Sequence, residues 1–334
     1  MGNLRLNDAV IAVTYKCNSK CSMCNIWKES PKNELAPEKF SKIPAGLKDI
    51  NITGGEPFLR NDLVEIIENI NSVNPKARLI FSSNGFATEK IVYFMKKIKK
   101  INPNTGIGIS LDGIDEMHSK IRGIDNAYSK VISTIIDLKK AGIKDIRIGF
   151  TGSNQNIQHL SKIYDIARLY DIEFTLSIVH NSENYFNIDT NLTPDFDDLE
   201  KELNYVINNE FKSINPRRLL RTFYMRGILK FQMTGKRPLA CQALKDFFYM
   251  DPEGYIFPCN ILNKPVGNIR ENDFETIWNS AKTDKLRKYC ENCNDCWMVC
   301  TAKSSIRREF LSVAKEIIPA KIKTLYPKLA EISH

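Results

Sequence analysis

Three cysteines stand close together near the amino terminus, Cys17, Cys21 and Cys24, separated by three residues and then by two. They follow the apolar run 10–13, which predicts a loop that leaves a strand. Three thiolates on one short loop can hold three irons of a cubane iron–sulfur cluster and leave the fourth iron free for a small molecule. A structural zinc site is the alternative, but it needs a fourth ligand, and none of the four histidines is near this loop.

A second motif, Thr53-Gly54-Gly55-Glu56-Pro57, follows the next predicted strand. Taken in this order, the cysteine loop and the Gly-Gly-Glu motif resemble the signature of the radical S-adenosylmethionine (radical SAM) enzymes. The resemblance implies a [4Fe–4S] cluster whose open iron binds S-adenosylmethionine (SAM), and an external electron donor such as a flavodoxin or ferredoxin. In that family an electron cleaves SAM to methionine and a 5′-deoxyadenosyl radical, which removes a hydrogen atom from the substrate.

The same resemblance assigns SAM binding to residues at the ends of the first four strands. Gly54 and Gly55 lack a Cβ, which lets the backbone approach the methionine amine, and Glu56 places a negative charge near that cation. Met23 and Trp27 flank the cluster, and the Met23 thioether can pack against adenine. For the remaining candidates, the alternatives to SAM binding are that the residues only form tight turns or, for the arginine, that it lies at the surface. These candidates are Ser83, Asn84, Ser110, Asp112 and Arg122.

Six more cysteines lie between positions 241 and 300. Cys241 is followed by the segment 250–259, whose Gly254 predicts a β-hairpin that delivers Cys259. This arrangement resembles the opening of the auxiliary-cluster domains called SPASM and twitch. The later cysteines depart from the full SPASM pattern, because two residues rather than five separate the second from the third, and none follows the fourth. They are Cys290, Cys293, Cys296 and Cys300.

Six thiols cannot fully ligate two cubanes, because two would need eight. We therefore expect a twitch-like domain with one auxiliary [4Fe–4S] cluster, and an incomplete second cluster is the alternative. Cys290 or Cys300 would then be a bystander, a ligand of that second cluster or a hydrogen-atom donor in catalysis. A zinc knuckle is a further alternative, since zinc sites also use paired Cys-x-x-Cys. The expected ligands of the single cluster are Cys241, Cys259, Cys293 and Cys296.

The elements that position these residues alternate regularly over the first 180 residues. Each strand candidate is followed by a helix-length segment with helical apolar spacing, which predicts a parallel α/β sheet with right-handed crossovers. The resemblance implies a partial (β/α)6 TIM-like barrel, whereas the periodicity alone also allows an open doubly wound sheet. In either case the small polar loops lie at the carboxyl edge of the sheet, where α/β folds place ligands. The predicted strands are 9–14, 48–53, 78–82, 106–111, 145–151 and 172–179.

Four parts of the chain are expected: the radical SAM core in 1–210, a bridging segment in 211–240, the auxiliary domain in 241–300 and an amphipathic helix in 301–334. The bridging segment contains eight Lys or Arg and no Asp or Glu. It is expected either to be a solvated helix or to line the route of the substrate into the barrel. The last helix, which Pro319 should kink or end, packs on its own domain or rests on an anionic membrane surface.

Composition narrows the class of protein. The chain of 334 residues is 43% hydrophobic and 26% charged, as in soluble globular proteins, and no apolar run is long enough to cross a membrane. No signal peptide is apparent, so the nine cysteines indicate metal ligation in a reducing, cytoplasmic setting. The net charge of +9 suggests an anionic substrate or partner. Nucleic acid is not favoured, because no recognised binding module accompanies the basic segment.

Three functions follow from these patterns. The first is a radical SAM oxidoreductase or isomerase that oxidises or epimerises a small molecule, such as a sugar or a phosphate-containing compound. That preference rests on the short segment before the first strand, since peptide-modifying relatives often begin with a peptide-binding domain. The second is a peptide-modifying radical SAM enzyme, whose recognition domain can be a separate chain. The third is a non-catalytic iron–sulfur or zinc protein, which would not need the Gly-Gly-Glu loop.

Overall fold

The computed structural model describes residues 6–29 and 33–325. The segments 1–5 and 326–334, which include the end of the expected C-terminal helix, lie outside this range. The strands are β1 (Asp8–Thr14), β2 (Asp49–Gly54), β3 (Arg78–Ser83), β4 (Thr105–Ser110), β5 (Ile146–Gly152), β6 (Glu173–Ile178), β7 (Phe247–Met250), β8 (Tyr255–Phe257) and β9 (Gly267–Asn268). The α-helices are α1 (Leu63–Val73), α2 (Thr88–Ile101), α3 (Glu116–Arg122), α4 (Ala127–Lys140), α5 (Leu160–Leu169), α6 (Phe196–Phe211), α7 (Pro216–Thr234), α8 (Phe274–Trp278), α9 (Ala281–Glu291), α10 (Val299–Arg308) and α11 (Phe310–Leu325).

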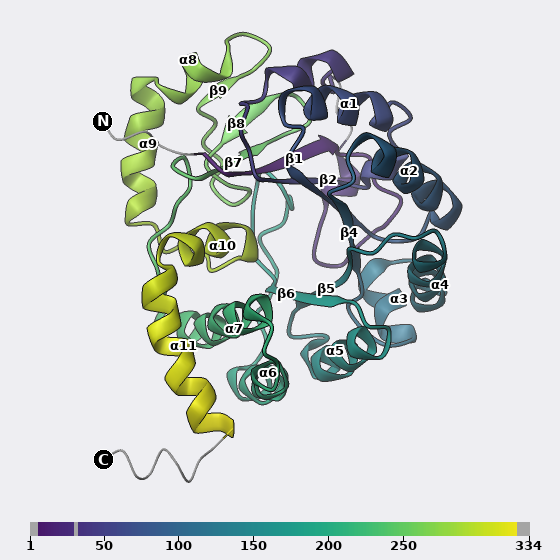
Figure 1. Ribbon diagram of the computed structural model, residues 1–334, viewed down its shortest axis with the longest axis vertical. Coiled ribbons are helices and arrows are strands. Elements are labelled where there is room, and N and C mark those ends of the chain that lie inside the picture. The colour runs from purple at the N-terminus through teal and green to yellow at the C-terminus, as the bar shows by residue number, and fades with distance from the viewer. Residues whose placement is uncertain (1–5, 30–32, 326–334) are drawn as a thin grey trace.

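Strands β1 to β6 pair in parallel and in chain order, and they curve into an incomplete barrel with helices on its outer face (Figure 1). The partial (β/α)6 barrel expected from the sequence is therefore confirmed. Each predicted strand agrees with the observed one to within a residue at either end. Parallel pairing places the carboxyl ends of all these strands at one edge of the sheet and their amino ends at the other.

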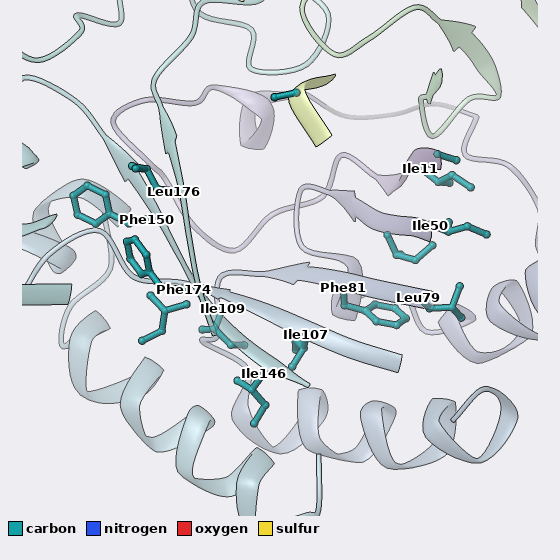
Figure 2. Close-up of a cluster of buried hydrophobic side chains, with 14 of the residues drawn as sticks. Ile11, Ile50, Leu79, Phe81, Ile107, Ile109, Ile146, Phe150, Phe174 and Leu176 are labelled. Atoms are coloured by element: carbon teal, nitrogen blue, oxygen red, sulfur yellow. The ribbon is translucent and has the colours of Figure 1, made fainter. Parts of the chain in front are cut away.

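Alternation along the strands separates an apolar outer layer from a polar interior. In β5, Ile146, Ile148 and Phe150 are buried, whereas Arg147 and Thr151, at alternate positions, face a cavity inside the barrel. Successive side chains of a strand point to opposite faces, so the apolar set packs under the helices while the polar set lines the interior. Figure 2 shows apolar side chains of this outer layer, contributed by successive strands of the barrel.

Strand β7 extends the barrel sheet beyond its first strand, a pairing that the sequence did not predict. It lies parallel to β1, with Asp8 opposite Phe247, and β8 and β9 continue the sheet in antiparallel pairing. The expected hairpin is present between β7 and β8, and its Gly254 adopts φ +91°, a conformation that favours glycine. The auxiliary region is therefore built onto the edge of the barrel.

Helix α10 covers the open side of the barrel, between β6 and β1 (Figure 1). Val299 and Cys300 at its amino end face the barrel interior. Further along the helix, Lys303 pairs with Asp49 at 2.9 Å and Arg307 pairs with Asp8 at 3.1 Å. Both aspartates begin strands, so α10 spans the barrel wall from the carboxyl ends of the strands to their amino ends.

The C-terminal region differs from the single helix that the sequence predicted. Helix α10 ends at Arg308, which pairs with Asp246, and α11 begins in a new direction and packs on α6 and α7. Val313 and Ile317 of α11 are buried there, which is the packing on its own domain that was one expectation. Pro319 lies inside α11 without ending it. Among the described residues, no helix combines the length and the apolar character needed to cross a membrane.

Candidate active site

A cavity of about 220 Å³ opens at the carboxyl ends of the barrel strands. It brings together residues from the loops after β1 to β4, which the sequence places far apart. This convergence follows from parallel pairing, since each loop leaves its strand at the same edge. Of the residues proposed from the sequence, the cavity wall contains Cys17, Cys21, Cys24, Gly54, Gly55, Ser83, Asn84, Ser110 and Arg122.

The cysteine loop is held in place by the end of α3. The backbone N–H of Lys20 donates to the Arg122 carbonyl at 3.1 Å, and that of Ser22 donates to the Ile121 carbonyl at 2.8 Å. Gly123 adopts φ +63°, and a Cβ at this position would lie 2.6 Å from the Lys20 carbonyl oxygen. Glycine is required here because the two loops approach so closely, and this contact fixes the three thiols on one wall of the cavity.

The donor set of this wall fits an iron–sulfur cluster with one open iron. Burial raises the pKa of Cys17 to about 11 and that of Cys24 to about 12. Metal ligation requires thiolates, so iron would offset the cost of ionising these thiols. A cubane takes its thiolates at separate corners, and the adjoining cavity leaves room for a ligand of the fourth iron.

Gly54 and Gly55 are needed for close packing between two loops. The Gly55 N–H donates to the Thr14 carbonyl at 2.8 Å. A Cβ on Gly54 would lie 2.1 Å from the Thr14 carbonyl oxygen, and one on Gly55 would lie 2.3 Å from that of Lys16. Side chains at these positions would therefore push the second loop away from the cysteine loop. Both glycines remain in the cavity wall, where their backbone can contact a ligand.

Glu56 lies behind the cavity rather than in its wall. Its fully buried carboxylate accepts hydrogen bonds from the Asn84 N–H at 2.8 Å and from the Ser83 hydroxyl at 3.0 Å. Burial raises its pKa to about 7, although these hydrogen bonds act in the opposite direction. Asn84 in turn donates to the Asn18 side chain at 2.7 Å, beside Cys17. Glu56 therefore positions the loop after β3 against the cysteine loop.

Asp112 also lies behind the wall, where it holds Arg122. Arg122 Nε lies 2.5 Å from Asp112 Oδ2, and the Thr151 N–H donates to Oδ1 at 2.7 Å. The aspartate is fully buried, so its carboxylate is used inside the protein and does not face the cavity, where direct SAM binding was expected. Burial raises the pKa of Asp112, and the Arg122 charge offsets only part of that effect. His118 accepts from the Asp112 N–H at 3.0 Å.

Arg122 is therefore placed between a buried carboxylate and a cluster thiol. Its Nη1 lies 3.6 Å from Cys21 Sγ, and the side chain lines the cavity. Burial alone would lower the pKa of Arg122, but the charges of Asp112 and Cys21 raise it, so the guanidinium stays charged. A fixed positive charge at this point can stabilise a thiolate and an anionic ligand group in the cavity.

The loop after β6 completes the cavity with residues that the sequence did not identify. The Tyr185 hydroxyl lies 2.9 Å from the Thr53 hydroxyl and 3.3 Å from the Gly54 carbonyl oxygen. Asn191 donates to the Met23 carbonyl at 3.1 Å, next to the cysteine loop. Met298, just before α10, also lines the cavity, as do Met23 and Trp27. No spacing rule points to Tyr185 and Asn191, because the long loop between β6 and α6 brings them there, and Met298 comes from the segment before α10.

A second cavity of about 270 Å³ occupies the barrel interior. It shares four hydroxyl-bearing residues with the first cavity, which lie at the boundary between the two. Cys300 lines this interior cavity, whereas Cys290 lines neither of the two. Of the two candidate hydrogen-atom donors, the structure therefore brings only Cys300 near a space that a substrate could occupy. The shared residues are Ser82, Ser110, Thr151 and Ser177.

The six C-terminal cysteines gather near the face of β1 and β7 that is turned toward the barrel interior. Cys241, Cys259 and Cys290 are buried together with Tyr249 and Phe257. Burial is the largest cause that raises the pKa of each of the other five thiols. The charge of a Cys241 thiolate is a further cause in every case, so all five thiols lie near Cys241. The gathering fits auxiliary iron–sulfur ligation in this region. It does not distinguish Cys293 and Cys296 from the two thiols expected to be spare.

Comparisons with known proteins agree with this arrangement. The model of the radical SAM superfamily matches residues 11–167, and that of the SPASM iron–sulfur cluster-binding domain matches residues 241–297. A probable GTP 3′,8-cyclase of Sulfurisphaera tokodaii is 28% identical over 169 residues, which cover 48% of this chain and 52% of the cyclase. The matched part therefore spans about half the length of that relative.

Other similarities run along nearly the whole chain. The sporulation killing factor maturation protein SkfB of Bacillus subtilis is 22% identical over 329 residues, covering 93% of this chain and 72% of SkfB. Among solved structures, anSMEcpe with bound SAM has a TM-score of 0.64 at 17% identity and covers 94% of this chain and 99% of its own. SuiB of Streptococcus suis has a TM-score of 0.66 at 16% identity, with 87% and 72% covered.

These likenesses in structure concern the fold, and the two family models concern the cofactor sites. The first model spans the cysteine loop and the Gly-Gly-Glu motif, and the second includes five of the six C-terminal cysteines. The cofactors are accordingly a [4Fe–4S] cluster with SAM in the barrel and iron–sulfur ligation in the C-terminal domain. The chain belongs to the radical SAM superfamily and carries a C-terminal SPASM iron–sulfur domain.

Proposed function

We propose that this radical SAM enzyme modifies a peptide. The observation that carries the proposal is the extent of the similarity to SkfB, a maturation protein, which runs through both the barrel and the auxiliary domain. The similarity to probable GTP 3′,8-cyclases, by contrast, covers about half of the chain. A shared auxiliary domain is more informative about the substrate than a shared barrel, because the barrel supplies the step common to the superfamily.

Support also comes from a solved structure with the same fold. Structures of anSMEcpe, which has the same fold, have been solved with bound SAM and a peptide. The small-molecule substrate preferred from the sequence alone is accordingly less well supported than the peptide alternative. The basic segment 211–240 would suit a phosphate-containing substrate, but its Arg217 and Arg221 lie away from the thiol cavity.

The residues of the cavity have separable tasks in this proposal. Cys17, Cys21 and Cys24 would hold the cluster, which when bound supplies the electron that cleaves SAM. The backbone at Gly54 and Gly55 and the guanidinium of Arg122 would bind the methionine part of SAM. The hydroxyls at the boundary of the two cavities would orient the peptide carbon that loses hydrogen, and Met298 and Tyr185 would limit access of water.

The auxiliary domain would hold one [4Fe–4S] cluster near the Cys241 thiol. In a peptide oxidation it would accept the electron that remains after hydrogen abstraction, while a proton leaves the substrate. We keep Cys241, Cys259, Cys293 and Cys296 as the proposed ligands. Iron counting after anaerobic reconstitution tests the number of clusters, since one auxiliary cubane gives about eight irons per chain and two give about twelve.

The proposal is tested with candidate peptides encoded beside the gene. Reconstituted enzyme, SAM and reductant are incubated with each peptide under anaerobic conditions, and mass spectrometry follows both the peptide and 5′-deoxyadenosine. The expected result is a mass change in one peptide that depends on SAM, with stoichiometric 5′-deoxyadenosine. A peptide deuterated at the reacting carbon should transfer deuterium to 5′-deoxyadenosine.

The control is the variant in which Cys17, Cys21 and Cys24 are replaced by Ala, which should form neither product. If no peptide changes, and a phosphorylated small molecule instead accelerates 5′-deoxyadenosine formation and is itself altered, the peptide proposal is wrong and the small-molecule alternative is correct. If the reconstituted protein never cleaves SAM, the catalytic proposal as a whole fails.

A further inference from the structure

A third cavity opens at the opposite end of the barrel from the thiols. It has a volume of about 610 Å³, and its wall includes Asp49, Arg78 and Glu173, the first residues of β2, β3 and β6. We call this cavity the basal pocket. Arg217 and Arg221 of α7 and Lys303 and Arg307 of α10 close it from the side. The basic segment 211–240 therefore contributes to this pocket and not to the SAM cavity.

Positive charge predominates around the basal pocket. Its wall carries three carboxylates, those of Asp49, Asp145 and Glu173. Neighbours just outside it, Asp8, Glu210 and Arg218, pair with the wall residues or with each other. Counting these neighbours leaves seven cations against five anions, and an excess of positive charge in a concave site attracts anions. The six basic side chains of the wall are Arg78, Arg147, Arg217, Arg221, Lys303 and Arg307.

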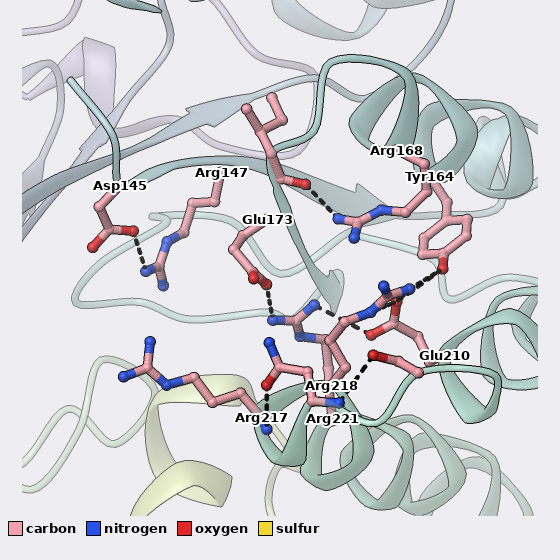
Figure 3. Close-up of polar contacts among 12 residues, drawn as sticks. Asp145, Arg147, Tyr164, Arg168, Glu173, Glu210, Arg217, Arg218 and Arg221 are labelled. Carbon is pink, nitrogen blue, oxygen red and sulfur yellow. Dashed lines mark hydrogen bonds and ion pairs between the residues drawn. The ribbon is translucent and has the colours of Figure 1, made fainter. Parts of the chain in front are cut away.

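Two arginines of the pocket have hydrogen-bonding groups that no protein acceptor uses. Arg147 donates from Nη2 to Asp145 at 3.1 Å, but its buried Nε has no hydrogen-bond partner among the residues described. Arg217 makes no ion pair within the described part of the chain, and Figure 3 shows its side chain extending from α7 toward Arg147. Like charges so placed disfavour each other unless an anion lies between them.

The neighbouring arginines are, in contrast, fully engaged. Arg221 pairs with Glu173 and contacts Glu210 at 3.4 Å, and Arg218 donates to the same Glu210 at 2.7 Å (Figure 3). These pairs fasten α7 to α6 and to the start of β6. They explain part of the basic segment as structural ion pairing, as in the solvated-helix expectation, and they leave Arg147 and Arg217 to be explained.

Apart from Thr175, the rest of the wall is mainly apolar. Phe174, Leu220, Tyr224 and Ile306 contribute to it, and Phe310 at the rim is 48% exposed. Cavities of this size, with an apolar wall and a few convergent polar groups, are typical of small-molecule sites, which range from about 300 to 1,000 Å³. An inorganic ion alone would leave the apolar part of this wall uncovered.

We propose that the basal pocket binds a small organic anion that carries at least two negative charges and an apolar group such as a ring. Its phosphate or carboxylate oxygens would lie between Arg147 and Arg217, and its apolar group would lie against Leu220 and Ile306. The site is distinct from the SAM cavity and does not depend on the substrate being a peptide. Because Lys303 lies three residues after Cys300 on α10, the bound anion would contact the helix that also faces the barrel interior.

Isothermal titration calorimetry on the reconstituted full chain tests the proposal. The probes are phenyl phosphate, phthalate and inorganic phosphate, each titrated at low ionic strength and again at about 0.15 M salt, where surface charges are screened. Phenyl phosphate and phthalate distinguish a phosphate from a carboxylate ligand. Either should bind more tightly than inorganic phosphate, because only they can cover the apolar wall.

The test variant is Arg217→Ala, since Arg217 is exposed and unpaired within the described residues, and its loss should not affect folding. The Kd of the tighter organic probe should rise about tenfold, the effect of one charge-assisted hydrogen bond. The matched control is Arg226→Ala on the same helix, where the exposed side chain does not line the pocket and Kd should change less than about twofold.

Three results would overturn the proposal. One is the absence of binding by all three probes at millimolar concentration, and another is a Kd that Arg217→Ala leaves unchanged. The third is loss of probe binding when Cys17, Cys21 and Cys24 are replaced by Ala, which would place the probes in the SAM cavity. The first two results would mean that the basic residues serve only to hold the base of the barrel together.

Discussion

Replacing Arg122 by Leu should destabilise the protein in a way that depends on pH. The change removes the partner of Asp112, whose carboxylate is fully buried, and leaves it either charged without compensation or forced to take up a proton. Protonating a carboxyl group with an ordinary pKa of about 3.9 at pH 7 costs about 4 kcal/mol, at 1.36 kcal/mol per pH unit. This agrees with the roughly 3–5 kcal/mol found when one member of a buried ion pair is removed.

The sign of the pH dependence follows from the direction of the pKa. Burial already raises the pKa of Asp112 in the native protein, and loss of Arg122 would raise it further. A folded state that favours the protonated carboxyl loses stability as pH rises above the unfolded pKa of about 3.9. The destabilisation by Arg122→Leu should therefore be at most about 4 kcal/mol at pH 7 and at most about 1.5 kcal/mol at pH 5, because the wild type already bears part of this cost.

The assay is urea unfolding of the iron-free protein under reducing conditions, followed by circular dichroism at pH 5, 6 and 7. The control is the double variant Arg122→Leu with Asp112→Asn, which keeps the acceptor for the Thr151 N–H and removes the buried charge. It should recover most of the stability and lose the pH dependence. Equal destabilisation at pH 5 and pH 7, or no recovery in the double variant, would refute this account of the pair.

Three further predictions concern other parts of the molecule. Replacing Cys17, Cys21 and Cys24 by Ala should lower the iron content by about four per chain while leaving auxiliary iron in place, and an unchanged iron count would contradict the assignment. Burial raises the pKa of Asp251 to about 7, so native stability should fall as pH rises from about 4 to 7, and Asp251→Asn should flatten that slope in urea unfolding. Gly227→Ala places a methyl group 2.5 Å from a buried indole nitrogen and should cost about 1–3 kcal/mol in the same assay, whereas a neutral effect would mean that α7 can shift.

The sequence was sufficient for the barrel and for the cysteine loop. Strand positions follow from local alternation of apolar strands and amphipathic helices, and the three clustered thiols are close in space because they are close in the chain. The hairpin that delivers Cys259 was also local, since a single turn at Gly254 determines it. Such features depend on neighbours within about ten residues, and so their pattern can be read directly.

Features that depend on long-range packing were not accessible in this way. Glu56 and Asp112 were expected at the ligand, and both lie behind the cavity wall because they satisfy buried donors from other loops. Tyr185 and Met298 reach the cavity through a long loop and the end of the auxiliary domain. Their distance in sequence from the thiols left no periodic signal.

What the sequence by itself determined is the chemistry: three thiols on one loop, a Gly-Gly-Glu turn and six later cysteines after an α/β repeat. Only the tertiary structure decided the environment of each group. Parallel pairing of β7 with β1 places the auxiliary thiols beside the inner face of the barrel sheet, and α10 covers the open side of the barrel. The position of the basic segment at the amino ends of the strands also depends on how α7 packs against α6 and the barrel, a contact between segments that local sequence does not encode.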